Sequence, residues 1–508
     1  MHALHATNSA NFSVPGAGKT ATALAVIGTH LAQEHIDVVV VVGPLSCFRP
    51  WEREAEAALP GQLNVRRVRN LHRTARAGIF RRAGRGDLLL LSFATAASDR
   101  YELERLCRRL RVMLVVDESH RVKRFRGGQW APALMEVARY ARVKMILTGT
   151  PMPHGPKDLW SQFNVLWPGA EATGSRAAYA SRADANFDAV RGELEPFFVR
   201  TPKSELGLQP AEFFEHEIAM PPLQRDIYEL IVHRLRQGIP DAASWQDRID
   251  TLRRARPIRL IQAASNPDLL NEADGFFHIP PISAPSGTLM ERLHRYREFG
   301  ELPAKFEWAL NFLGQLKQEG RKCVVWTSFI RNIDQFSELV RNRHDVPVYS
   351  VDGRVPAADV SDESAAADET RETRIDQFLA EGGSAVLVAN PAACAESISL
   401  HSNCFVAVYL DRTHDCARWL QSIDRIHRLG LPPDVTVEVH VLKATDNGQD
   451  AVDELVAQSL SVKGHRMQML LEEAELRGTG LDDQDTLRAA EGSAADLSAL
   501  LRYLLGEE

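Results

Sequence analysis

Short, wholly apolar runs constrain the fold of this chain more than any other feature of its sequence. They recur through the first part of the chain at residues 38–42, 88–91, 113–116 and 145–147, with amphipathic segments such as residues 21–33 between them. A parallel strand is apolar throughout when helices cover both faces of its sheet. The pattern therefore predicts an α/β domain with a parallel sheet over residues 1–205.

A second group of apolar runs predicts another α/β domain over residues 305–445. Its strand candidates are residues 323–327, 346–351, 385–388, 405–410 and 435–442. Residues 206–304 lack such runs and are rich in helix formers, so we expect a helical region between the two domains. Residues 446–508 predict a helical, acidic tail.

Charge, hydropathy and cysteine usage limit the function classes. The 508 residues include 60 Lys and Arg against 67 Asp and Glu, so any nucleic-acid surface must be local. No apolar stretch approaches the roughly 18 residues that span a bilayer, and we see no secretory signal. The six cysteines form no C-x-x-C pair and are expected to be reduced thiols. We therefore expect a cytoplasmic protein without a membrane partner.

A glycine-rich segment, SVPGAGKT at residues 13–20, precedes the helix expected at residues 21–33. Such a turn directs backbone N–H groups and the positive end of the helix dipole to one point, which suits polyphosphate. We expect Lys19 to contact the β- and γ-phosphates and Thr20 to hold Mg²⁺. The predicted phosphate-binding residues are Pro15, Gly16, Ala17, Gly18, Lys19 and Thr20. The alternative is a glycine turn that caps an ordinary helix.

Two acids, Asp117 and Glu118, end the apolar run that begins at residue 112. Open parallel sheets bind ligands at the carboxyl ends of their strands. Asp117 is suited to coordinating Mg²⁺ through a water, and Glu118 to polarising the water that attacks the γ-phosphate of ATP. The alternative is a surface turn with two solvated acids.

A third strand-end motif contains Thr148 and Thr150 within the sequence TGTP. We expect these hydroxyls to contact the two carboxylates and to relay the state of the nucleotide. The alternative is an ordinary turn of threonine, glycine and proline.

In this order the three motifs resemble those of the superfamily-two, DExH-type ATPases, and more narrowly the Swi/Snf family of double-stranded DNA translocases. Further similarity is carried by Trp51, Glu54, Gln224, Tyr228, Lys305 and residues 90–93, 158–160, 197–204, 266–270, 324–329 and 352–353. The resemblance covers about residues 12–445. It implies two RecA-like parallel-sheet domains in tandem, a helical insertion between them, a helical tail, ATP and Mg²⁺ as cofactors and duplex DNA as partner.

The last motif, QSIDRIHRLG at residues 421–430, also resembles that family. The resemblance implies that Gln421, Arg425 and Arg428 are catalytic. The two arginines are three residues apart, so we expect them on one face of a helix, where guanidinium groups could meet charge developing on the γ-phosphate. Because they belong to the second domain, they would reach the nucleotide only when the domains close. The alternative is a helix with two surface arginines.

The sequence departs from the family pattern at two places. Family members carry a glutamine segment before the phosphate loop, whereas residues 1–13 contain no glutamine. The fifth family motif usually contains glycine where this chain has Glu396 and Ser397. The explanations for the missing segment are a truncated or mis-started chain, another mode of adenine binding, and a protein partner that supplies the segment.

An arginine-rich island without acids, residues 62–86, is the first candidate for contact with DNA phosphates. A second basic group follows the carboxylates. The candidate DNA contacts are Arg66, Arg67, Arg69, Arg73 and Arg124. Either group could instead be a solvated or partner-facing surface.

The leading hypothesis is a nucleoid-associated, ATP-dependent motor that hydrolyses ATP on duplex DNA and remodels or displaces bound proteins. The alternative is a nucleotide-switched, weakly hydrolysing DNA-binding subunit of a multi-protein complex. A small-molecule kinase is disfavoured, because kinases need no second α/β domain that ends in paired arginines.

Overall fold

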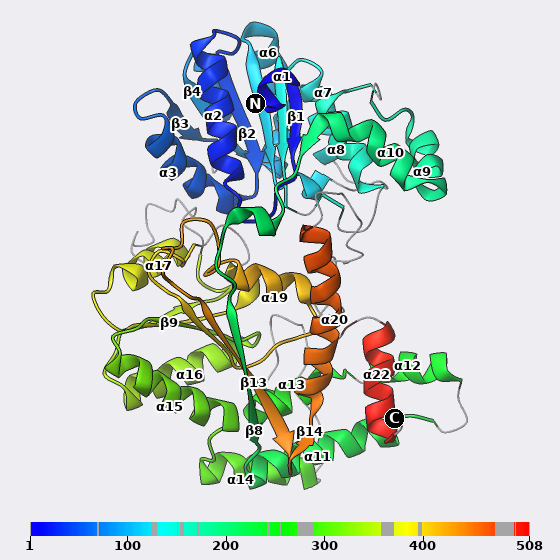
Figure 1. Ribbon diagram of the computed structural model, residues 1–508, viewed down its shortest axis with the longest axis vertical. Coiled ribbons are helices and arrows are strands. Elements are labelled where there is room, and N and C mark those ends of the chain that lie inside the picture. Colours follow the sequence, from blue (N-terminus) through cyan, green and yellow to red (C-terminus); the bar gives the residue numbers. More distant parts are fainter. Residues whose placement is uncertain are drawn as a thin grey trace. The chain divides into compact units, whose positions relative to one another are not determined.

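The computed structural model describes residues 2–68, 71–122, 130–149, 151–152, 157–169, 172–240, 244–254, 256–271, 288–356, 370–394, 399–472, 492 and 494–506. These residues form two compact units. The first contains the described residues up to 207 together with 466–472, and the second contains those from 208 to 465 together with 492 and 494–506. Each unit has its own sheet and hydrophobic core (Figure 1).

The first unit is built on a seven-stranded sheet in the order β3-β4-β2-β5-β6-β1-β7. All neighbouring strands are parallel. The strands are β1 (Asn8–Asn11), β2 (Val38–Gly43), β3 (Asn64–Arg67), β4 (Asp87–Ser92), β5 (Val112–Asp117), β6 (Val143–Leu147) and β7 (Phe198–Val199). The predicted parallel α/β fold of this part of the chain is confirmed.

Helices cover both faces of the first sheet because alternate residues of its central strands enter two separate cores. Val39 and Val41 pack with α2 and α3, whereas Val40 and Val42 pack with α4, α6, α7 and α8. Figure 1 shows α2 and α3 on one side of the sheet and α7 and α8 on the other. The helices are α1 (His2–His5), α2 (Lys19–Ala32), α3 (Phe48–Ala58), α4 (Arg73–Arg82), α5 (Phe93–Ser98), α6 (Arg100–Arg109), α7 (Trp130–Ala138), α8 (Asp158–Leu166), α9 (Arg176–Ala185) and α10 (Phe187–Leu194).

The second unit contains another seven-stranded sheet, in the order β10-β11-β9-β12-β13-β14, with β8 paired to β13. Its strands are β8 (Glu212–Ala219), β9 (Cys323–Trp326), β10 (Val348–Val351), β11 (Val386–Ala389), β12 (Val406–Tyr409), β13 (Glu438–Asp446) and β14 (Gln449–Asp450). All pairs are parallel except β13 with β14. The second α/β fold is likewise confirmed.

Strand β8 corrects the prediction that residues 206–304 contain no strand. It pairs with β13 along its whole length, from Glu212 beside Glu438 to Ala219 beside Thr445. β8 pairs with no second strand among the described residues, and most of its side chains are exposed. An edge strand of this kind has no buried face, so it lacks the continuous apolar run that marks a central strand.

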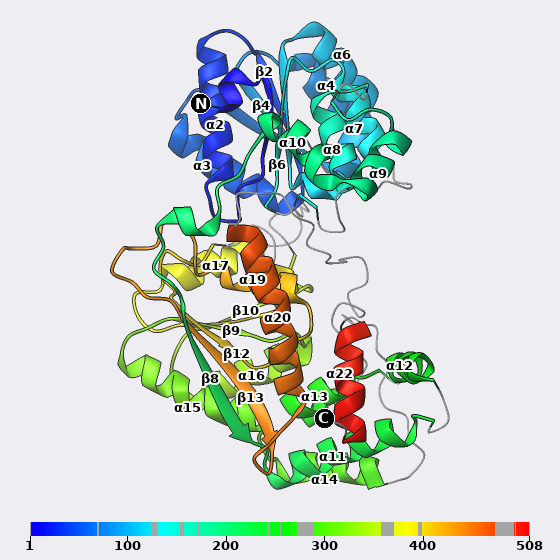
Figure 2. The ribbon, with the colours of Figure 1, turned by 45° about the vertical axis from the view of Figure 1, so that its right-hand side comes forward.

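Helices from the middle and the end of the chain share one core in the second unit. Residues of α11, α13 and α14 pack there with residues of α20 and α22. Figure 2 shows α22 beside α11 and α12. The helices of this unit are α11 (Pro222–Gln237), α12 (Trp245–Arg254), α13 (Ile258–Ser265), α14 (Thr288–Phe299), α15 (Ala304–Gln318), α16 (Ile330–Arg343), α17 (Arg371–Ala380), α18 (Pro391–Cys394), α19 (Cys416–Ile423), residues 452–465 of α20 (Val452–Glu472) and α22 (Ala494–Leu505).

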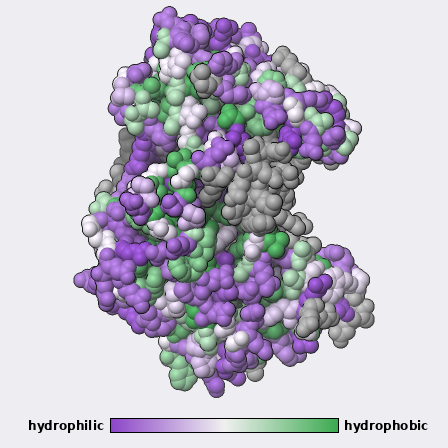
Figure 3. Space-filling view, in the orientation of Figure 1, coloured by the Kyte–Doolittle hydropathy of each residue, from purple (hydrophilic) through white to green (hydrophobic). Residues whose placement is uncertain are grey.

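Polar side chains predominate on the face drawn in Figure 3, including the outer surface over α15 and α16. Within the described ranges, no helix combines the length and the apolar character that crossing a bilayer requires. All six cysteines lie in these ranges, where their thiols are buried and form no disulfide.

Candidate functional site

Three adjacent strands bring the predicted site residues of the first unit to one edge of the sheet. Leu147 at the end of β6 pairs with Asn11 at the end of β1 and with Asp117 at the end of β5. The chain leaves β1 into the glycine-rich loop, β5 into Glu118 and β6 into Thr148. The loop, the carboxylates and the threonine therefore meet at the carboxyl edge, where parallel sheets bind ligands.

The glycine-rich loop adopts a conformation that depends on its glycines. Gly16 has φ of 80°, and Gly18, which precedes the first residue of α2, has φ of 70° and ψ of 35°. Side chains strain this left-handed region, so glycine is favoured at both positions. Helix α2 begins at Lys19, two residues earlier than predicted, which places Lys19 and Thr20 in its first turn. The ammonium group of Lys19 donates to the carbonyl oxygens of Ser13 (3.0 Å) and Val14 (3.2 Å) and so lies over the loop.

Ser13 ties the loop to the segment that leaves the first unit. Its hydroxyl oxygen accepts a hydrogen bond of 3.0 Å from the backbone N–H of Thr201. The backbone N–H of Val14 also donates to the carbonyl of Thr201, over 3.1 Å. A glycine at position 13 would lack the first of these bonds. The serine thus fixes the loop against the chain after β7.

Asp117 is a buried carboxylate with a donor on each oxygen. Its Oδ2 accepts from Nε1 of Trp51 and its Oδ1 from the backbone N–H of Glu118, both over 2.9 Å. Burial, and then the charge of Glu118, raise the pKa of Asp117 to about 6. Glu118 has φ of 49°, a left-handed conformation that is uncommon for a residue with a side chain. Such strain often marks functional positions.

His120 links the carboxylates to the third motif. Its Nδ1 lies 3.2 Å from Oε2 of Glu118 and 2.9 Å from Oγ1 of Thr148. Burial alone would raise the pKa of Glu118, but the hydrogen bond and charge of His120, together with the charges of Lys19 and Arg121, lower it below its usual value. The link between Thr148 and the acidic pair thus runs through His120, which sequence reasoning did not assign. Thr150 lies outside the described residues.

Gln162 of α8 provides a second link that the sequence did not indicate. This fully buried side chain accepts from the hydroxyl of Ser119 over 2.8 Å and donates to the carbonyl of Pro151 over 2.6 Å. It therefore bridges the segment after β5 to the segment after β6. A lone glutamine in a helix carries no local signal for this role.

The oxygen-bearing side chains at this sheet edge fit a nucleotide bound together with Mg²⁺. Mg²⁺ in nucleotide sites is usually bound by one or two carboxylates or hydroxyls, with phosphate oxygens and waters as its other ligands. Thr20 and Asp117 are the residues that would hold it. Two neighbouring carboxylates, one with its pKa raised by the other, form a site in which a cation would relieve repulsion. The described residues contain no cluster of three or more metal-ligating side chains that would hold a metal without such a ligand.

The secondary structure of the last motif differs from the prediction. Arg425 and Arg428 do not lie on a helix. Gln421 belongs to α19, which ends at Ile423, and both arginines follow in a run of turns. The carbonyl of Arg425 accepts from the backbone N–H of Leu400 over 2.9 Å. In a continuing helix that carbonyl would accept from residue 429. The guanidinium of Arg428 is anchored instead by the hydroxyl of Ser399, over 2.6 Å.

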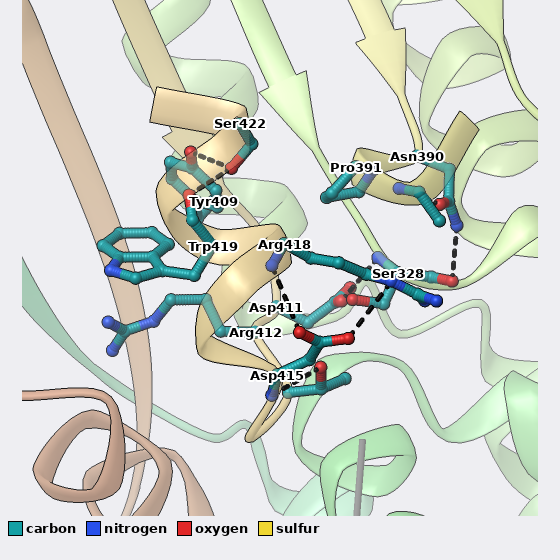
Figure 4. A pocket seen from close by; sticks show the side chains of 12 residues that line it. Ser328, Asn390, Pro391, Tyr409, Asp411, Arg412, Asp415, Arg418, Trp419 and Ser422 are labelled. Carbon is teal, nitrogen blue, oxygen red and sulfur yellow. Dashed lines mark hydrogen bonds and ion pairs between the residues drawn. The ribbon is translucent and has the colours of Figure 1, made fainter. Parts of the chain in front are cut away.

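A polar pocket lies at the carboxyl ends of β9, β11 and β12 in the second unit (Figure 4). Asp411 accepts from the backbone N–H of Ser328 over 2.7 Å, and the amide of Asn390 donates to the carbonyl of Ser328 over 2.8 Å. Arg418 also lines this pocket and lies 3.1 Å from Asp415. The pocket thus brings an amide, a guanidinium group and two carboxylates together at the ends of three strands. Sequence reasoning missed the pocket because its residues come from separate strand ends.

Several arginines of the basic island are paired within the first unit. Arg66 lies 3.3 Å from Asp87, and Arg67 lies 2.6 Å from Glu52. Both partners lie outside the island, so these two arginines are paired within the first unit. Arg73, the first residue of α4, is exposed. Arg69 and Arg124 lie outside the described residues.

The chain is similar to a known protein family, to several curated proteins and to solved structures. The SNF2-related domain family matches residues 13–256. An "Uncharacterized ATP-dependent helicase" of Mycoplasma pneumoniae is 22% identical over 451 residues, which cover 87% of this chain and 38% of the relative. The mouse (Mus musculus) "SWI/SNF-related matrix-associated actin-dependent regulator of chromatin subfamily A member 1" is 23% identical over 493 residues, covering 94% of this chain and 42% of the relative.

The chain thus spans about two fifths of the length of these curated relatives. Among solved structures, the "Sulfolobus solfataricus SWI2/SNF2 ATPase core in complex with dsDNA" is 20% identical. The match covers 91% of this chain and 88% of that one, with a TM-score of 0.36.

Proposed function

Because residues 13–256 match the SNF2-related domain family, we propose that the chain is an ATP-dependent motor that hydrolyses ATP on duplex DNA and remodels or displaces bound proteins. The observation that carries this proposal is the meeting of the glycine-rich loop, the acidic pair and Thr148 at one sheet edge. This is the arrangement that phosphoryl transfer from a nucleotide requires.

In the proposed reaction the loop and Lys19 bind the phosphates of ATP. Thr20 and Asp117 hold Mg²⁺, which would neutralise phosphate charge. Glu118, kept ionised by His120, orients the attacking water and accepts its proton. His120 also contacts Thr148. A movement of the Glu118 side chain would therefore displace His120 and, through it, Thr148 of the third motif.

The second α/β domain, residues 305–445, is proposed to complete the site. Arg425 and Arg428, with Gln421, would reach the γ-phosphate when this domain closes on the first, residues 1–205. The turn that carries the arginines is fixed to residues 399 and 400, so a movement of that segment would move the arginines as well. Hydrolysis and domain movement would thereby be coupled.

We place duplex DNA as the polymer along which the motor moves. The protein would accordingly be associated with the nucleoid. A translocase needs contacts with the phosphate backbone more than with base edges. The exposed Arg73 in the first unit and the partly exposed Arg418 in the second are basic groups available for such contacts. The family resemblance supports DNA as the partner, and these groups are where we place it.

The test is ATP turnover of the purified chain, measured with and without duplex DNA. We expect hydrolysis that rises with DNA concentration, and that disappears in Lys19→Ala and Glu118→Gln. Turnover that does not change across DNA concentrations would overturn the motor proposal. Nucleotide-dependent DNA binding with only residual turnover would instead favour a switched subunit of a larger complex.

A further inference from the structure

A second cavity lies in the first unit at the opposite edge of the sheet from the nucleotide loop. Its volume is about 510 Å³, and it is lined where α6 leads into β5 and where α7 leads into β6. Asp37, just before β2, lies on the same edge. The cavity therefore sits at the amino ends of three central strands, whereas the nucleotide loop sits at their carboxyl edge.

Arginine dominates the lining of this cavity. Its charged residues are Asp37, Arg108, Arg109, Arg111 and Arg142. The one carboxylate is fully engaged, because Asp37 accepts from Nε of Arg111 over 3.0 Å and from Nη2 over 2.6 Å. Those hydrogen bonds lower the pKa of Asp37 and keep it ionised. The positive charge of Arg111 and the negative charge of Asp37 therefore neutralise each other.

The other arginines leave positive charge at the cavity. Arg108 is paired with Glu104 over 2.8 Å and stacks on Tyr140, with its guanidinium carbon 4.2 Å from the ring centre. Arg109 is held by two neutral acceptors, the carbonyls of Phe80 (2.9 Å) and Ala83 (3.0 Å). The exposed side chain of Arg142 has no partner among the described residues. Arg109 and Arg142 therefore contribute two charges that no carboxylate balances.

We propose that this arginine cavity is a phosphate-binding site, distinct from the nucleotide loop. Planar guanidinium groups bind phosphate oxygens bidentately, and Arg109 is already oriented by its carbonyl partners. The C-termini of α6 and α7 at this edge each carry about half a negative charge, so together they offset only one of the two unbalanced positive charges. The positive charge that remains favours a bound phosphate. The phosphate is either that of a free phosphate compound or that of a nucleic-acid backbone.

The test is calorimetric titration of the full chain with inorganic pyrophosphate. We expect two classes of site, one lost in Lys19→Ala and the other weakened about tenfold in Arg142→Ala. The matched control is Arg139→Ala, an exposed arginine three residues away that does not line the cavity. Its isotherm should equal that of the wild type. Equal isotherms for Arg142→Ala and Arg139→Ala would overturn the proposal, whatever Lys19→Ala shows.

A second arm distinguishes the two sources of phosphate. Duplex DNA is added to the chain saturated with pyrophosphate, in the Lys19→Ala background. Displacement of pyrophosphate, with weaker DNA binding in Arg142→Glu than in Arg139→Glu, assigns the site to the DNA backbone. Retention of pyrophosphate assigns it to a free phosphate compound. Absence of pyrophosphate binding in this background overturns the proposal.

Discussion

Trp51 donates a hydrogen bond of 2.9 Å from its indole Nε1 to Oδ2 of Asp117, and both side chains are buried. The bond favours the ionised carboxylate and so opposes the rise in the pKa of Asp117 that burial and Glu118 cause. Helix α3 thereby helps to set the charge of a residue proposed to hold Mg²⁺. The fit between Gly43 and Asp117 is also close, since a Cβ at position 43 would lie 3.2 Å from that of Asp117.

The variant Trp51→Phe should move the acidic limb of ATP turnover to higher pH. Ionised Asp117 is lost as pH falls through its pKa of about 6, and loss of the indole donor raises that pKa further. A hydrogen bond to a charged group contributes about 1.5–3 kcal/mol, so a shift of about one to two pH units is expected. The measurement is the pH profile of kcat/KM. Trp160→Phe, which removes a donor to Gly174 in the same unit, should leave the limb in place.

Arg425→Ala should separate nucleotide binding from hydrolysis. If the arginine acts on the transition state, turnover should fall about a thousandfold while nucleotide affinity changes little. Lys19→Ala should lower both quantities. Turnover and binding of a fluorescent ATP analogue are the measurements, with the exposed Arg341→Ala as control. A loss of binding in Arg425→Ala as large as that in Lys19→Ala would contradict its assigned role.

Gln162→Leu should weaken the first unit around β5 and β6. The change keeps most of the volume of the side chain but leaves the hydroxyl of Ser119 and the carbonyl of Pro151 without their partner. Each unsatisfied buried group costs about 1–3 kcal/mol. Faster hydrogen exchange is therefore expected over residues 112–122 and 143–149. The exposed Gln33→Leu provides the comparison, and equal exchange in the two variants would refute the proposed bridge.

Lys305→Met should destabilise the second unit by about 3–5 kcal/mol, because Asp453 would become an unpaired buried charge. The two side chains are almost fully buried and lie 2.6 Å apart. The double variant Lys305→Met/Asp453→Asn should recover part of the loss. Urea unfolding measures the free energy of unfolding of the second unit in the wild type and in both single and double variants. If the loss of stability in the double variant equals the sum of the losses in the single variants, the two residues are not coupled.

The second unit should lose stability as the pH falls below about 6.5. Nε2 of His216 lies 3.0 Å from Nδ1 of His440, and burial lowers the pKa of both imidazoles. The charge of His216 lowers the pKa of His440 further, whereas Glu438, which is also paired with Arg321, opposes that decrease. The unfolded chain thus binds protons at a pH where the folded chain does not, so unfolding is favoured on acidification.

Hydrogen exchange of β8 and β13 between pH 7.5 and 5.5, corrected for its intrinsic pH dependence, measures this effect. The variant His216→Gln/His440→Gln should show a smaller acid-induced increase in exchange than the wild type. A matched change at the exposed His233, His233→Gln, should behave as the wild type does. An identical acid response in all three proteins would rule out the pair as its source.

Much of the fold follows from sequence because buried parallel strands are continuous apolar runs. β2, β4, β5 and β9 are of this kind. The glycine-rich loop and the acidic pair can also be recognised in the sequence, since each consists of contiguous residues. Strand β8 was not, because its pairing partner β13 is distant in sequence and an exposed edge imposes no apolar pattern.

Side-chain links between motifs were harder to predict than the motifs. His120 contacts Thr148, and Gln162 joins Ser119 to Pro151, only because β5, β6 and α8 are neighbours in space. The sequence predicts a helix through Arg428, whereas α19 ends at Ile423, for a similar reason. A tertiary hydrogen bond from Leu400 takes the carbonyl of Arg425, and no residue within the motif records that bond.

The pairing of β8 with β13 sets an order of events during synthesis. The first unit's sheet is complete in sequence once β7 has left the ribosome, so that unit can fold early. β8 emerges next, with Phe213 and Phe214 exposed, and must wait until β13 has been translated before it has a neighbour. Throughout that interval the nascent chain carries an unprotected, aromatic strand. Chaperone dependence of this protein should therefore concentrate on the growth of its second half.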